Sequence, residues 1–173
     1  MIDPVFLQAH ALFGGVSDEQ IPILVAHLNQ EQYPPGAYLF HQEDAADRLF
    51  LITQGSVEVL SQTGAAEPVR LAVRGIGESI GEMALIDVQN RSASVRTLEP
   101  VVVLSLSHAS LEQIYQAEPG LFTQIILNIA REISRRLRSM DALLGCALYE
   151  TSDHQCRASI QTSNSAMGKG LEK

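Results

Sequence analysis

Residues 81–95 read Gly-Glu-Met-Ala-Leu-Ile-Asp-Val-Gln-Asn-Arg-Ser-Ala-Ser-Val, and this stretch concentrates groups that suit a ligand better than a packed core. Gly81 has no Cβ, so its backbone can approach a bound molecule closely. The residues from Glu82 to Ile86 predict one short helical turn. The first N–H groups of such a turn lack partners within it and can point at an anion. The stretch therefore predicts an anion-binding loop.

Arg91 and Glu82 indicate what kind of molecule this loop binds. A guanidinium offers a planar fork of donors that matches a phosphate. The hydroxyl of Ser92 and the amides of Ser92 and Ala93 add further donors. Glu82 carries an acceptor-only carboxylate, which cannot bind a phosphate but can accept from a sugar hydroxyl. The combination indicates a ribose whose phosphate is enclosed by protein.

These residues form a pattern that resembles the phosphate-binding cassette of the cyclic nucleotide-binding domain family. The family pattern is close to Gly-Glu-x-(Ala/Gly)-Leu, followed after several residues by Arg-(Ser/Ala/Thr)-Ala. Here it stands as Gly81 to Leu85 and Arg91 to Ala93, with Asn90 where many members have proline. The resemblance extends over about residues 10–145, which is most of the chain.

The resemblance implies a set of ligand contacts. Arg91 would pair with the charged oxygen of a cyclic phosphate, Ser92 and Ala93 would complete its shell, and Glu82 would accept from the ribose 2′-hydroxyl. The remaining implied contacts are the backbone of Gly81, Met83 and Ala84 on the ribose side, Val57, Leu71 and Ala72 beside the base, and Arg136 from the C-terminal helix.

The base-binding end of the pattern matches the family less closely. Members that resemble the catabolite activators place adjacent Thr and Ser hydroxyls against the adenine, and Met140 and Asp141 stand at the corresponding positions here. Methionine is apolar, and an ionised aspartate accepts hydrogen bonds but cannot donate them. Selectivity for adenine is therefore not predicted, and the ligand stays open between cAMP, cGMP and another cyclic nucleotide.

Short runs of alternating residues, separated by turns that contain glycine, predict a small antiparallel sandwich or barrel. The expected strands lie at residues 37–40, 49–52, 56–60, 68–73, 92–98 and 101–106. Apolar residues at helical spacing predict helices within residues 1–30 and over 107–116. The predicted fold class is α+β. The resemblance implies an antiparallel β-roll, a jelly-roll-like double-stranded barrel, flanked by N-terminal helices and a long C-terminal helix.

From about residue 119 to 147 the apolar residues follow a heptad pattern. The heptad seam consists of Ile126, Ala130, Ile133, Leu137, Met140, Leu144 and Ala147. A helix of this length is roughly 40 Å long at 1.5 Å per residue and extends past a small barrel. Two interpretations stay open. The seam packs on its own barrel, or it pairs with the same helix of a second copy, as the resemblance to dimeric members implies. We favour the homodimer, and we expect ligand binding to signal through this helix.

Composition restricts the classes of function. The chain has 173 residues, 46% of them hydrophobic, and a formal net charge of −8, which disfavours contact with a nucleic acid backbone. Its two cysteines lack the neighbours of a zinc site or a disulfide framework. Neither a membrane-spanning run nor a signal peptide is recognisable. These features predict a cytoplasmic protein without a metal, a cofactor or a membrane partner.

The predicted domain organisation is one cyclic nucleotide-binding domain over residues 1–147 and a polar, disordered tail over 148–173. Activator members of the family continue into a helix-turn-helix after the long helix, and the remaining residues here are too few and too polar for one. We therefore expect no direct DNA binding. The output would pass to a separate effector protein, or the chain is a fragment of a longer one.

Three other classes of function compete with a cyclic-nucleotide sensor. The main alternative is a dimerising interaction module whose pocket has degenerated and binds no ligand. An enzyme is disfavoured because no Ser/His/Asp set, metal cluster or suitably spaced carboxylate pair is recognisable. A receptor for cyclic dinucleotides would need a larger and more basic pocket than this acidic chain indicates.

Overall fold

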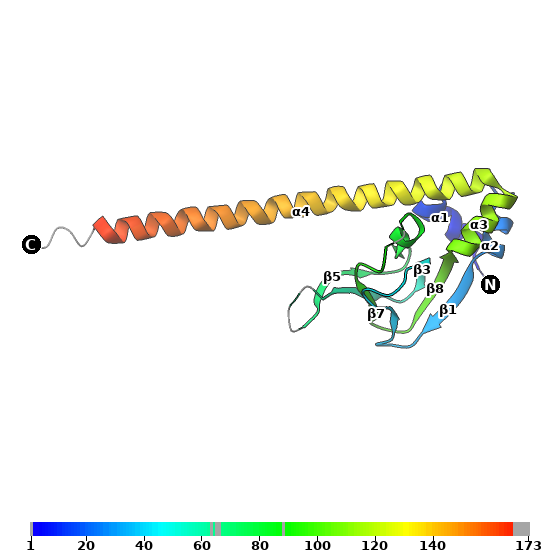
Figure 1. Ribbon diagram of the computed structural model, residues 1–173, viewed down its shortest axis with the longest axis horizontal. Coiled ribbons are helices and arrows are strands. Elements are labelled where there is room, and N and C mark those ends of the chain that lie inside the picture. The colour runs from blue at the N-terminus through cyan, green and yellow to red at the C-terminus, as the bar shows by residue number, and fades with distance from the viewer. Residues whose placement is uncertain (1, 63, 65–66, 88, 168–173) are drawn as a thin grey trace, which may run out of the picture. The chain divides into compact units, whose positions relative to one another are not determined.

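The structure is a computed structural model that describes residues 2–167, apart from 63, 65–66 and 88 (Figure 1). It divides into two compact units, Met1–Ile133 and Ser134–Lys173, each of which is described by itself. The first unit contains both β-sheets and the predicted ligand-binding loop. The second unit is the continuation of the C-terminal helix.

Eight strands form two four-stranded antiparallel sheets in the first unit, with the orders β1-β8-β3-β6 and β2-β7-β4-β5. The strands are β1 (Asn29–Tyr33), β2 (Tyr38–Phe40), β3 (Arg48–Gln54), β4 (Val57–Ser61), β5 (Val69–Arg74), β6 (Ser79–Ile80), β7 (Ser94–Thr97) and β8 (Val101–Ser107). The predicted α+β fold with an antiparallel β-roll is confirmed.

Helices cover one sheet of the roll. They are α1 (Pro4–Ala9), η1 (Ala11–Phe13), α2 (Ile21–Ala26), α3 (His108–Ala117) and α4 (Pro119–Met167), and a further 3-10 helix, η2 (Glu82–Leu85), lies within the cassette. The side chain of Asp3 caps α1, and that of Ser107 caps α3. Within the described residues, no helix is both long enough and apolar enough to cross a membrane.

Strand β3 is buried on both faces and joins two hydrophobic clusters. Leu49 and Leu51 pack among the helices, whereas Phe50 and Ile52 pack between the two sheets. This division follows from the alternation of side chains along a strand. Strand β8, which pairs with β3, divides its apolar residues between the same two clusters. The roll is therefore anchored to its helices through these two strands.

The sequence did not predict strand β1. Its residues are Asn-Gln-Glu-Gln-Tyr, and only the first two, Asn29 and Gln30, lie where a helix was expected. None of the first four is apolar, so the strand has no periodic signal of its own. It forms by pairing with β8, with Asn29 opposite Ser105 and Tyr33 opposite Val101. The predicted helix before it is shorter than expected, at Ile21–Ala26.

Helix α4 continues to Met167, beyond the end expected near residue 147. The polar composition of 148–173 predicted a disordered tail, but residues 148–167 are helical in the structure. The sequence has no proline after Pro119, and Gly145 is the single glycine between Gly120 and Gly168, so little in it stops a helix. Residues 168–173 lie outside the described part of the chain. The domain boundary at 147 remains a prediction, while the compact units divide at Ile133.

Gly55 closes the turn between β3 and β4. It has a φ of 81°, and a Cβ at this position would overlap the carbonyl oxygen of Pro100 and crowd Val101. Gly36 has a similar φ of 76°, but a Cβ there would meet no atom within 4 Å. The two glycines share a left-handed backbone and differ in the space around it.

We therefore predict that Gly55→Ala lowers the free energy of unfolding by about 3 kcal/mol, because backbone strain and overpacking add. Gly36→Ala, the matched control, should lower it by about 1 kcal/mol through strain alone. Urea unfolding followed by circular dichroism measures both values. Equal losses in the two variants would contradict the close approach of Gly55 to Pro100.

Candidate functional site

Gly81 begins the loop that holds the cassette. Its backbone angles, φ 70° and ψ 20°, lie in the left-handed region that side chains rarely adopt. Helix η2 follows directly, and the Ala84 amide donates to the Gly81 carbonyl at 3.1 Å. A Cβ at Gly81 would lie 2.5 Å from Nη1 of Arg91. The left-handed backbone favours glycine here, and a side chain would displace the end of Arg91. The helical turn predicted at 82–86 is confirmed.

Glu82 is buried at the start of η2, with 6% of its surface exposed. Ala84 and Leu85 are buried as well, and η2 packs on β3. Met83 is half exposed. A carboxylate is costly to bury unless polar groups compensate it. The turn thus directs an acidic residue, rather than the neighbouring apolar Met83, into the protein.

Arg91 is a buried cation with weak polar contacts, and 5% of its surface is exposed. Nη1 donates to the Gly81 carbonyl at 3.4 Å, and Nη2 lies 3.9 Å from Oδ1 of Asp47. Its Nε is buried and makes no hydrogen bond within the described residues. Burial lowers the pKa of the Arg91 guanidinium, and the charge of Asp47 opposes that shift. Arginine remains protonated in proteins, so the site holds a positive charge that is incompletely compensated.

Two phenylalanine rings lie beside this cation. The Cζ atom of Arg91 is 4.1 Å from the ring centroid of Phe40 and 6.0 Å from that of Phe50. The two rings stack with centroids 5.9 Å apart and planes inclined by 21°. Phe40 comes from β2 and Phe50 from β3, so each sheet contributes one ring.

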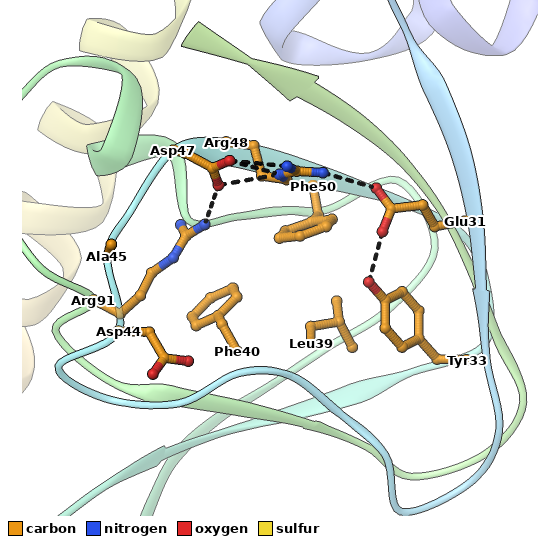
Figure 2. Close-up of a pocket in the computed structure, with 10 residues that line it drawn as sticks. All are labelled: Glu31, Tyr33, Leu39, Phe40, Asp44, Ala45, Asp47, Arg48, Phe50 and Arg91. Carbon is orange, nitrogen blue, oxygen red and sulfur yellow. Dashed lines mark hydrogen bonds and ion pairs between the residues drawn. The ribbon is translucent and has the colours of Figure 1, made fainter.

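The carboxylate of Asp47 belongs to a chain of polar side chains (Figure 2). Arg48 donates to Asp47 at 2.8 Å, and its Nη1 lies 3.6 Å from Glu31. The Tyr33 hydroxyl donates to Glu31 at 2.7 Å. The hydrogen bond from Arg48 lowers the pKa of Asp47. Because Asp47 is held mainly by Arg48, it is a distant and shared counter-ion for Arg91.

A cavity of about 220 Å³ lies beside this series of polar side chains. Figure 2 shows Phe40 and Phe50 between Arg91 on one side and Glu31 with Tyr33 on the other. The lining residues are Glu31, Tyr33, Leu39, Phe40, Asp44, Ala45, Asp47, Arg48, Phe50 and Arg91. Of the residues predicted from the sequence, this cavity includes Arg91 alone, and it borders the cassette from the side of β1, β2 and β3.

The predicted phosphate-binding amides lie directly after Arg91. Ala93 is buried and Ser92 is exposed. Within the described residues, neither amide makes a hydrogen bond. The Arg91 amide and carbonyl are both used, because they bond to the Asp44 carbonyl and the Glu43 amide at 2.9 Å each. The backbone at Arg91 is therefore fixed, while the next two amides remain open to an acceptor.

The residues predicted beside the base are not all available. Val57 is fully buried in the cluster between the sheets, so its side chain offers no surface to a ligand. Val59 is part-buried and lies opposite Ala72, whereas Leu71 is exposed. Val59 and Ala72 are thus the neighbouring pair on β4 and β5. Arg136 belongs to the second unit, and its contact with the base remains a prediction.

Sequence reasoning missed several residues that hold the site together. Asp47, Phe40 and Phe50 contact Arg91 across the fold, and no spacing in the sequence links them to it. His108 bridges two parts of the site, since its ring Nε2 hydrogen-bonds the Ala84 carbonyl and its amide donates to the Asp47 carbonyl at 2.9 Å. The sequence offers one signal for these missed residues. Asp47 is an acidic residue that directly precedes a buried strand, and this position could have marked it as a candidate site residue.

The sequence matches the family described as "Cyclic nucleotide-binding domain" over residues 30–118, just over half of the chain. It is 29% identical over 144 residues to a protein named cyclic AMP receptor protein from Thermus thermophilus, which covers 83% of this chain and 65% of that protein.

Solved structures agree with this match. The N-terminal domain of a transcriptional regulator from Streptomyces coelicolor A3(2) is 31% identical, with a TM-score of 0.69 over 78% of this chain and 94% of that one. A cyclic nucleotide-binding domain from Methylobacillus flagellatus is 28% identical, with a TM-score of 0.71 over 78% and 76% of the two chains.

The chain therefore belongs to the cyclic nucleotide-binding domain family. The family match covers the strands from β2 to β8, the cassette and helix α3. The chain spans slightly less than two thirds of the Thermus protein.

The environment of Tyr33 gives a pH-dependent prediction. Burial and the hydrogen bond to Glu31 raise the pKa of Tyr33 from 10.0 to about 12. Because the folded pKa is the higher one, the neutral phenol contributes stability that is complete below about pH 10 and is lost as the pH rises through about 12. We expect the tyrosinate absorbance titration to lose its most alkaline step in Tyr33→Phe.

The control is Tyr115→Phe, because Tyr115 is half exposed and packs against Phe122, away from this network. This variant should retain the most alkaline step. Stability should also fall less steeply above about pH 10 in Tyr33→Phe than in the wild type. If Tyr33→Phe instead removes absorbance near the ordinary tyrosine pKa of 10.0 and keeps the most alkaline step, the bond to Glu31 is not formed.

Proposed function

We propose that this chain is a regulatory domain that binds a cyclic mononucleotide, cAMP or cGMP. The observation that carries the proposal is the buried cation of Arg91. Its Nε has no hydrogen-bond partner within the described residues, and its two terminal nitrogens make only long contacts. A cyclic phosphate brings one negative charge and acceptor oxygens, which are what this group lacks.

The rest of the cassette supports the same assignment. The open amides of Ser92 and Ala93 follow Arg91 directly and would donate to the phosphate. The buried carboxylate of Glu82 is an acceptor for the ribose 2′-hydroxyl. Charge-assisted hydrogen bonds contribute about 1.5–3 kcal/mol each. After the costs of ordering and desolvation, three or four of them are consistent with micromolar binding, or about −8 kcal/mol.

The choice between cAMP and cGMP depends on the base. The resemblance implied that Val57 lies beside the base, but Val57 is buried. Val59 on β4 and Ala72 on β5 are part-buried and lie opposite each other, so we assign the contact with the base to them. By the resemblance, Arg136, Met140 and Asp141 stand at positions where family members contact the base. None of these last three groups can act as both donor and acceptor, as a hydroxyl does. We therefore leave the base open between adenine and guanine.

Helix α4 supports a homodimer as the output of the domain. Within the first unit, α4 buries Leu121, Ile125 and Ile129 completely. Of the predicted seam, Ile126 and Ile133 are part-buried and pack against the cluster beneath the helices, and the described seam residues that follow Ile133 are exposed. Leu137, Met140 and Leu144 are 58%, 66% and 59% exposed, and Ala130 is exposed as well. The Ala147 side chain lies outside the described part. An apolar heptad stripe of this kind suits a parallel partner helix, and nucleotide binding would shift the arrangement of the pair.

Calorimetric titration tests the proposed function. With protein first freed of bound nucleotide by unfolding and refolding, we expect micromolar binding of cAMP or cGMP and none of cyclic di-GMP. Arg91→Ala should weaken binding by about tenfold to a hundredfold, because it removes a charge-assisted contact. Arg96→Ala is the matched control, since this exposed arginine pairs with Glu58 on the same sheet as β2.

Absence of heat with all three nucleotides, from protein that is folded, would contradict the sensor. It would favour the alternative, a dimerising interaction module with a degenerate pocket. Equal losses in Arg91→Ala and Arg96→Ala would place the nucleotide elsewhere.

Sedimentation velocity tests the homodimer. Leu137→Glu combined with Leu144→Glu introduces charges into the seam, so we expect the dimer to dissociate into monomers. Ala142→Glu is the control, because residue 142 lies away from the seam in the heptad and is exposed. A wild-type chain that sediments as a monomer throughout the concentration range would remove the homodimer from the proposal.

A further inference from the structure

The buried charge of Arg91 needs stabilisation that its polar contacts do not provide. The ion pair with Asp47 is long, at 3.9 Å, and Asp47 itself is 58% exposed and bonded to Arg48. The Gly81 carbonyl contributes one hydrogen bond at 3.4 Å. A charged group inside a protein is costly to bury unless it is paired. Another neighbour must therefore supply part of the stabilisation.

The ring of Phe40 is in position to do so. The guanidinium carbon lies 4.1 Å from its centroid, well within the range of a cation–π contact. Phe50 stacks behind Phe40 and lies farther from the cation, at 6.0 Å. Phe50 is buried in the cluster between the sheets, which fixes the second ring and supports the first. Phe40 packs against the same cluster.

We propose that Phe40 is the positioning residue for Arg91, and that it holds the guanidinium by its face while leaving the N–H edges available to a phosphate. A carboxylate in this place would bond to the same N–H edges and compete with the ligand. An aromatic face stabilises the charge without using those donors. The role in nucleotide affinity rests on the proposed function, whereas the contact between Phe40 and Arg91 is measurable without nucleotide.

The first test changes the electrostatics of the ring and keeps its shape. Phenylalanine at position 40 is replaced by its mono-, di- and trifluorinated analogues, which weaken the negative potential of the ring face step by step. Affinity for the cyclic nucleotide should fall with each fluorine, by about tenfold over the series. The same series at Phe13, a fully buried ring in the other cluster, is the control and should leave the affinity unchanged. A flat series at Phe40 would overturn the proposal.

The second test needs no nucleotide. Urea unfolding is measured for the wild type, Phe40→Leu, Arg91→Met and the double variant. Phe40→Leu should raise the unfolding equilibrium constant about fivefold more when Arg91 is present than when it is methionine. An equal effect in both backgrounds would overturn the contact, whatever the chain binds. If this coupling is present and no cyclic nucleotide binds, the proposed function fails while the contact stands.

Discussion

The burial of the Arg91 guanidinium constrains much of the first unit. A desolvated charge is tolerated only where the surroundings offset the lost hydration. Here Asp47, the Gly81 carbonyl and the ring of Phe40 share that task. Each comes from a different segment, so the loop after β2, the cassette and β2 itself must meet at one place. The left-handed glycine at residue 81 then leaves room for the arginine.

Strand β3 makes this meeting possible. It begins with Arg48, which holds Asp47, and it contributes Phe50 to the aromatic pair. It also packs on the helices through Leu49 and Leu51. One strand thus links the charged site to both hydrophobic clusters. His108 adds a second link, because it connects the first turn of α3 to the cassette and to Asp47. The cassette therefore contacts α3 directly, through the hydrogen bond between His108 and the Ala84 carbonyl.

The sequence predicted the features that depend on short stretches of chain. The cassette was recognisable because its glycine, acid and arginine lie within fifteen positions, and its helical turn forms from local hydrogen bonds. Six of the strands followed from alternating side chains and glycine turns. The heptad seam on α4 was visible for the same reason, since helical spacing alone places its residues on one face. Three of its members, Leu137, Met140 and Leu144, are exposed in the second unit.

Tertiary structure alone decided which distant residues complete the site. Phe40, Phe50 and Asp47 reach Arg91 through strand pairing and sheet packing, which leave no mark in the spacing of residues. The sequence of strand β1 is too polar to show the alternation of a strand, and the strand forms by pairing with the edge of β8. Val57 was predicted at the base, yet the packing of the two sheets buries it and leaves Val59 part-exposed. The sequence by itself predicted the class of ligand-binding loop and the family, because a glycine, an acid and an arginine at short spacing form a local pattern. The contacts that stabilise the buried charge of Arg91 come from distant segments, which only the folded chain brings together.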